Sequence, residues 1–232
     1  MRTAMRLGTV SLLVLGGCRL PADAHQPQSA QWEQLGRLAL ARRLQRVDDG
    51  LGALLLSDRD ATVERVQAPF LERGAVYFVS AWSGWHSVKL FVGCADELTL
   101  DLSSPENFGR FTASAGLKLD SRSRQVAYAA LFLEATRRTS LRPFVVLHSV
   151  DQLRTRAEAR PEDKQRLSRI REVYRGAVAP CTEDGSPATV IVHAVDGNDL
   201  VRLRCVLSST GLLEVSTVQI LVRSLPVPYA YR

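Results

Sequence analysis

Several residue types and patterns that mark nucleic-acid-binding proteins are scarce in this chain. Only 3 of its 30 basic residues are lysine, and 6% of its 232 residues are aromatic. No run of basic residues alternates with aromatic ones, so the sequence gives little support to nucleic-acid binding, despite a formal net charge of +6. We interpret the excess of arginine over lysine mainly as the mark of a GC-rich genome and not of a binding site.

Cysteine and histidine are also sparse, and their spacing matches no metal motif. The chain has four cysteines, namely Cys18, Cys94, Cys181 and Cys205. Its histidines beyond residue 30 are His86, His148 and His193. The intervals between these residues are long and fit no zinc motif, so we expect no bound metal and no cofactor.

Motifs of hydrolytic and phosphate-binding enzymes are missing as well. The sequence holds no G-x-S-x-G, no H-E-x-x-H and no phosphate-binding glycine loop. His148, Ser149 and Asp151 are neighbours in the chain, but adjacent residues on one element rarely converge in a cleft as nucleophilic catalysis requires. A non-enzymatic role is therefore favoured, and an exported hydrolase with an unrecognised motif is the alternative.

The clearest feature that is present lies at the N-terminus. Arg2 and Arg6 precede an apolar run, residues 7–15, that is too short to span a bilayer as a helix. The run ends in an apolar residue and two small residues before a cysteine, which are Leu15, Gly16, Gly17 and Cys18. This pattern resembles the lipobox of bacterial lipoprotein precursors.

The resemblance implies a processing site and a location. In that class a diacylglyceryl group is attached to the cysteine thiol, a peptidase cuts before the cysteine, and the new amine is acylated, for example with palmitate. Residues 1–17 are then the signal peptide, Cys18 is the lipid-modified first residue, and residues 18–30 form a flexible tether. In lipoproteins that stay in the inner membrane, the residue after the lipid-modified cysteine is often Asp. Here that residue is Arg19, which favours attachment to the outer membrane, facing the periplasm, if the source has an outer membrane. The alternative is an ordinary secretory signal with a chance cysteine.

Export makes a disulfide possible among the three remaining cysteines. An odd number allows one disulfide and one free thiol. We expect Cys181 to pair with Cys205, because Cys205 lies on the core side of its predicted strand and Cys181 precedes the partner strand. Closing this loop would contribute about 3 kcal/mol in the chain-entropy model.

Hydrophobic periodicity predicts helices followed by a β meander in the first half of the mature chain. A helix is predicted over residues 31–56, with a break at residues 48–50 as the alternative, and a second, short helix is predicted over about residues 60–71. Strands are predicted over residues 75–81, 86–92 and 98–102, and residues 103–118 form a long connection with room for a helical turn.

The second half shows a similar order. A capped helix with an apolar centre at residues 126–133 is the predicted core helix. A short strand at residues 144–147, a capping box at Ser149 and Gln152, and a helix from Pro161 follow. Strands are then predicted over residues 188–195, 199–207 and 215–222.

These patterns together predict an α+β fold, with helices packed on antiparallel β meanders. The two three-stranded meanders form either separate sheets or one continuous sheet. We expect a single domain over residues 31–232, and the alternative is two similar units over residues 31–118 and 119–232.

Turn residues predict the registers of two hairpins. A two-residue loop at Ser83 and Gly84 places Val79 opposite Val88, and Trp82 opposite Trp85. A loop at Gly197 and Asn198 places Val192 opposite Leu203, with His193 facing Arg202 on a more polar side. In the last strand, the predicted core-facing residues are Val218, Ile220 and Val222.

Trp82, Trp85 and His86 lie together at the predicted tip of the first hairpin and form the candidate binding surface. Exposed tryptophans at a loop are frequent in binding surfaces because they offer a large contact area. The alternative is a cross-strand Trp pair that locks the hairpin or packs under a helix. The sequence thus predicts a lipid-anchored cell-envelope protein that binds another protein, a glycan or a small ligand.

Overall fold

A computed structural model describes residues 28–83, 86–137, 143–155, 158–183, 188–208 and 210–227. Within them the helices are α1 (Gln28–Gln45), α2 (Asp49–Ser57), α3 (Pro105–Ala115), α4 (Arg122–Arg137), the 3-10 turn η1 (Val150–Gln152) and α5 (Pro161–Val173). The strands are β1 (Thr62–Val66), β2 (Ala75–Ser83), β3 (His86–Ala95), β4 (Leu98–Asp101), β5 (Phe144–Val146), β6 (Cys181–Glu183), β7 (Ala188–Asp196), β8 (Asp199–Leu207) and β9 (Leu213–Val222).

The strands form two antiparallel sheets, so the molecule has the predicted α+β fold. The first sheet has the order β1-β2-β3-β4. The second has the order β5-β7-β8-β9, and β6 also pairs with β7. The two expected meanders are confirmed as β2-β3-β4 and β7-β8-β9, each in its own sheet with additional strands beside it.

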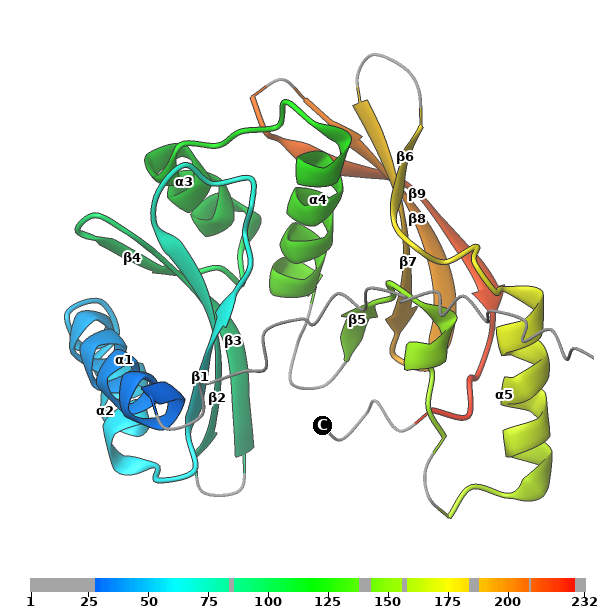
Figure 1. Ribbon diagram of the computed structural model, residues 1–232, viewed down its shortest axis with the longest axis horizontal. Coiled ribbons are helices and arrows are strands. Elements are labelled where there is room, and N and C mark those ends of the chain that lie inside the picture. Colours follow the sequence, from blue (N-terminus) through cyan, green and yellow to red (C-terminus); the bar gives the residue numbers. More distant parts are fainter. Residues whose placement is uncertain are drawn as a thin grey trace, which may run out of the picture.

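Helices cover both faces of each sheet, and α4 lies between the two sheets (Figure 1). α1 and α2 cover the outer face of the first sheet, where Leu44 and Leu55 pack with Val79. α5 and η1 cover the outer face of the second sheet, where Leu167 packs with Val195. The central core between the sheets takes side chains from α3, α4 and strands of both sheets.

The sequence of α4 accounts for its central place. The Ser121 hydroxyl accepts a hydrogen bond from the Arg124 N–H (3.4 Å), as the predicted cap requires. Tyr128 to Leu133 are all buried, because this apolar stretch has a sheet on either side. The ring of Phe108 on α3 meets Tyr128 edge-on at 5.6 Å. The predicted core helix is therefore confirmed.

Two predicted elements of the first half are wrong. The short helix expected near residues 60–71 is instead strand β1, since the β-branched residues Thr62, Val63 and Val66 pair with β2. The connection over residues 103–118 contains a full helix, α3, of 11 residues. Its start is capped by the Ser104 hydroxyl, and it ends at Gly116, whose φ of 75° suits a left-handed cap.

Of the two predicted hairpin registers, one is confirmed and one is wrong. Around Gly197 the prediction is confirmed, with Val192 opposite Leu203. In the β2–β3 hairpin the register is displaced by two residues, so Val79 lies opposite Leu90, and Trp82 lies opposite Ser87. Because the displacement is even, each side chain keeps its predicted face of the sheet.

The prediction that the last strand completes the core is wrong for two of its residues. Val218 is 50% exposed and Ile220 is 42% exposed. β9 is the edge strand of its sheet, whereas α4 packs against β5, β6 and β7. The central helix therefore leaves the edge at β9 open.

Candidate functional site

Trp82 is the exposed aromatic residue at the end of the β2–β3 hairpin. Its side chain is 57% exposed. Its backbone N–H donates a hydrogen bond to Oδ2 of Asp58 at 2.6 Å. Asp58 is the C-cap of α2, so the end of β2 is tied to the end of that helix. In Figure 1 the loop from α2 to β1 lies beside the end of β2 at the lower left.

Arg37 on α1 fixes the same loop from the other side. Its Nη1 group donates to the carbonyl oxygens of Asp58 (3.3 Å), Arg59 (3.4 Å) and Ala61 (3.3 Å). A guanidinium can make several such bonds at once because its donors are held in a planar fork. These bonds join α1, the α2–β1 loop and the backbone of β2 into one base at this end of the first sheet, and the Trp82 side chain lies on the face of β2 opposite α1 and α2.

Exposed apolar residues flank this base. Leu38 follows Arg37 on α1, and Leu56 lies two residues before Asp58 on α2; both are exposed. We call Trp82 together with this base, which includes Arg37 and Asp58, the Trp82 end. A rigid indole on a fixed backbone can bind a partner with little loss of side-chain entropy.

Of the three residues predicted for this surface, the structure places the side chain of Trp82. Trp85 lies outside the described residues. His86 begins β3 opposite Ser83, and its side chain is not among those described. Since Trp82 is exposed and lies opposite Ser87, it is not a residue packed under a helix.

Sequence reasoning missed Arg37 and Asp58. Asp58 follows the apolar end of α2 as a capping residue would, and that local signal was available. Arg37 contacts residues 21 to 24 positions away, and nothing in the local sequence indicates such contacts.

The histidines considered for catalysis do not gather in one place. His148 is exposed, and no hydrogen bond among the described residues joins its ring to Ser149 or Asp151. Ser149 and Gln152 instead form the predicted capping box of η1. His193 is buried, and burial together with the charge of Arg202 lowers its pKa. The expected pairing of His193 with Arg202 is confirmed, and their face of the sheet also carries Arg204 and Glu183, with which Arg202 and Arg204 form ion pairs, although His193 itself is buried.

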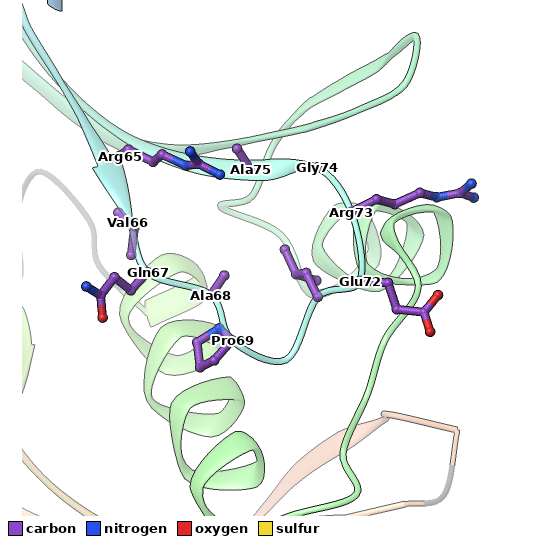
Figure 2. Close-up of a pocket in the computed structure, with 10 residues that line it drawn as sticks. Arg65, Val66, Gln67, Ala68, Pro69, Glu72, Arg73, Gly74 and Ala75 are labelled. Carbon is purple, nitrogen blue, oxygen red and sulfur yellow. The ribbon is translucent and has the colours of Figure 1, made fainter.

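A cavity of about 650 Å³ is lined by the segment that joins β1 to β2, residues 65–75. Figure 2 shows the Arg65 guanidinium directed along the cavity toward Ala75. Arg73 and Glu72 point away from it. Arg73 donates to the carbonyl oxygen of Ser114, and Glu72 pairs with Lys118 at 2.8 Å. The residues that line the cavity thus include Arg65, Gln67, Glu72 and Arg73 beside apolar side chains, and none of them is a serine, threonine, cysteine or histidine.

Three cysteines lie in the described part of the chain, and all three are free. The expected Cys181–Cys205 disulfide is not formed. Cys181 on β6 lies opposite Ile191 of β7, whereas Cys205 on β8 lies opposite Val190 on the other edge of β7. Consecutive residues of a strand point to opposite faces, so the two thiols lie two strands apart on opposite sides of the sheet.

The described part of the chain also lacks two other features. No group of three or more His, Cys, Asp or Glu side chains there is arranged to hold a metal ion. No helix in the described part of the chain is long and apolar enough to cross a membrane.

Comparison with known proteins does not extend this description. No protein-family model, no curated protein and no solved structure matches the chain. Function has to be argued from the residues themselves.

Proposed function

We propose that this protein is a lipid-anchored cell-envelope protein that acts as a non-enzymatic binding module, and that the Trp82 end is its binding surface. The observation that carries the proposal is the exposure of Trp82, 57%, on a base of four hydrogen bonds from three elements. An indole that is this exposed contributes little to the core, while it contributes a large area to a contact.

The position of α1 relates this surface to the proposed lipid. Gln28, where α1 begins, lies ten positions after Cys18. Ten residues span at most about 35 Å, so a lipid on Cys18 keeps the start of α1 within that distance of the membrane. Figure 1 shows this start of α1 just above the α2–β1 loop. The Trp82 end is thereby held near the membrane, where its partner is an envelope component.

Photo-crosslinking in cells tests the proposal. A benzophenone amino acid replaces Trp82, and in a matched control it replaces Val173, which is 72% exposed on α5 at the far side of the molecule. We expect a discrete adduct from position 82 in the membrane fraction, none of the same mass from position 173, and loss of the adduct in a Cys18→Ser background. Equal adducts from both positions, or none from position 82, would contradict the proposed binding surface.

A further inference from the structure

β9 is an edge strand with unusual features. It runs for ten residues, Leu213–Val222, and pairs with β8 along one side. No other described element pairs with its outer side. An edge strand presents a row of backbone donors and acceptors that can pair with another strand.

The short edge strand β1 of the first sheet is protected, whereas β9 is not. β1, at the edge of the first sheet, has five residues and carries Glu64 and Arg65. Charged residues on a short edge strand discourage pairing with other chains. β9 has no charged residue between Glu214 and Arg223, which lies just past its end.

Apolar side chains project from this open edge. Val218 and Ile220 lie opposite Leu203 and Val201 of β8, which are buried in the central core. Val218 and Ile220 lie on the same face of the sheet as Leu203 and Val201. Because α4 packs on β5, β6 and β7 and does not reach β9, about half of each side chain is exposed. A strand added at β9 would place its own side chains against them and bury them.

We propose that β9 pairs antiparallel with β9 of a second copy of this chain, centred on Gln219, to form a two-fold symmetric dimer through a continuous sheet. In this register Val218 meets Ile220 of the second copy and Ile220 meets its Val218. Gln219 meets Gln219 of the second copy, and an amide, which has donors and an acceptor, can bond to its own equivalent. The centre of the pairing lies in the regular part of β9, between the two register shifts against β8.

Charge favours a second copy in this orientation over a parallel arrangement. Glu214 is at one end of β9, and Arg223 lies just beyond the other. Antiparallel self-pairing brings the acidic end of one copy next to the basic end of the other, at both ends of the contact. Parallel pairing would bring like charges together, which is destabilising. A two-fold contact also uses both edges fully and closes the assembly at two copies.

Cysteine cross-linking tests the register. Directly opposite residues of antiparallel strands have Cα atoms about 4.5–5.5 Å apart, which lies within the range of about 4.4–6.8 Å that a disulfide accepts. Gln219→Cys, made in a Cys181→Ser background to remove the exposed thiol, should give a covalent dimer in the exported protein on non-reducing gels. Glu214→Cys in the same background should not, because the two copies of position 214 lie about 30 Å apart in this register. Cross-linking at 214 but not at 219 would overturn the register.

A substitution on the apolar face tests the contact itself. The protein as processed by the cell is extracted in mild detergent, and its mass is measured by light scattering with correction for the micelle. We expect a dimer for the wild type and for Val173→Lys, and a dimer weakened by about tenfold or more for Val218→Lys, since a buried unpaired charge costs several kcal/mol. A monomeric wild type, or a dimer that Val218→Lys leaves unchanged, would overturn the proposal. An adduct of position 219 with another protein would assign the edge to a different partner and overturn it equally.

Discussion

The hydroxyl of Tyr128 on α4 donates a hydrogen bond to the carbonyl oxygen of Gly211, in the turn between β8 and β9. The Tyr128 ring lies edge-on to Phe70 at 5.3 Å. Gly211 has a φ of 83°, and a Cβ there would lie 2.2 Å from Leu117, so the turn requires glycine at this place. One residue of the central helix thus holds the turn that leads into the open edge strand.

Removing this hydroxyl is expected to destabilise the fold. Tyr128→Phe should lower the free energy of unfolding by about 1–2 kcal/mol, because the buried carbonyl of Gly211 loses its donor. Chemical denaturation at neutral pH measures the difference, with Tyr174→Phe as a control on the outer helix α5. Equal stability of Tyr128→Phe and the wild type would mean that the bond contributes nothing.

The raised pKa of Tyr128 leads us to predict a loss of stability at high pH. Burial raises the pKa of Tyr128 from 10.0 to about 12, while the unfolded chain keeps the ordinary value. Below pH 10 both states are protonated and this group causes no pH dependence. As the pH rises from 10 towards 12 the unfolded state releases the proton first, so stability falls by up to about 1.4 kcal/mol per pH unit. Tyr128→Phe should show a smaller alkaline fall, and an unchanged slope would contradict the assignment.

The lowered pKa of His193 leads to the opposite prediction, which is that stability falls as the pH becomes acidic. Burial lowers its pKa below the ordinary value of 6.5, and Arg202 lowers it further. The neutral ring is therefore favoured in the folded state, and above pH 6.5 the group has no effect on the pH dependence. As the pH falls below 6.5 the unfolded chain takes up the proton first, and stability decreases. His193→Gln should flatten the dependence of the unfolding free energy on pH between pH 7 and pH 5, and a slope equal to that of the wild type would contradict this role of His193.

The thiols should differ strongly in reactivity. Cys205 is buried, and burial raises its pKa to about 11; burial also raises the pKa of Cys94. Cys181 is exposed. In the folded protein a polar maleimide should label Cys181 within minutes and the other two only on unfolding, because the thiolate is the reactive form. Rapid labelling of Cys205, or a Cys181–Cys205 disulfide found by peptide mapping, would contradict the structure.

Local signals account for the parts of the fold that the sequence predicts correctly. The hairpin around Gly197 and the capping box from Ser149 to Gln152 are each specified by a few adjacent residues. β1 was missed because its strand conformation depends on pairing with residues of β2 that lie 10 to 18 positions further along the chain. The exposure of Val218 was missed because alternation assigns a residue to a face of a sheet but does not say whether a helix covers that face.

For the candidate site too, the sequence predicts what depends on local residues and misses what depends on tertiary contacts. The tryptophans and the glycine turn marked the β2–β3 hairpin, and Trp82 is exposed there. The bonds that hold it come from Asp58 and Arg37, which lie 24 and 45 positions before it in the chain. Such contacts arise from tertiary packing, and no local pattern encodes them.

Replacing Trp82 should separate binding from stability. Trp82→Ala removes an exposed side chain, so the free energy of unfolding should change by about 1 kcal/mol or less. Phe111→Ala, in the central core, should lower it by about 3–5 kcal/mol. Capture of the envelope partner should be lost in the first variant. A Trp82→Ala protein that loses as much stability as Phe111→Ala would make Trp82 a structural residue.

The proposed function depends first on the lipid at Cys18, and metabolic labelling with a palmitate analogue tests that most directly. The wild type and Cys181→Ser, a matched removal of the exposed cysteine, should both incorporate the label and sediment with membranes. Cys18→Ser should incorporate none and should remain as a precursor or appear in the soluble fraction. If Cys18→Ser is labelled as strongly as the wild type and still sediments with membranes, the lipid anchor at Cys18 is contradicted.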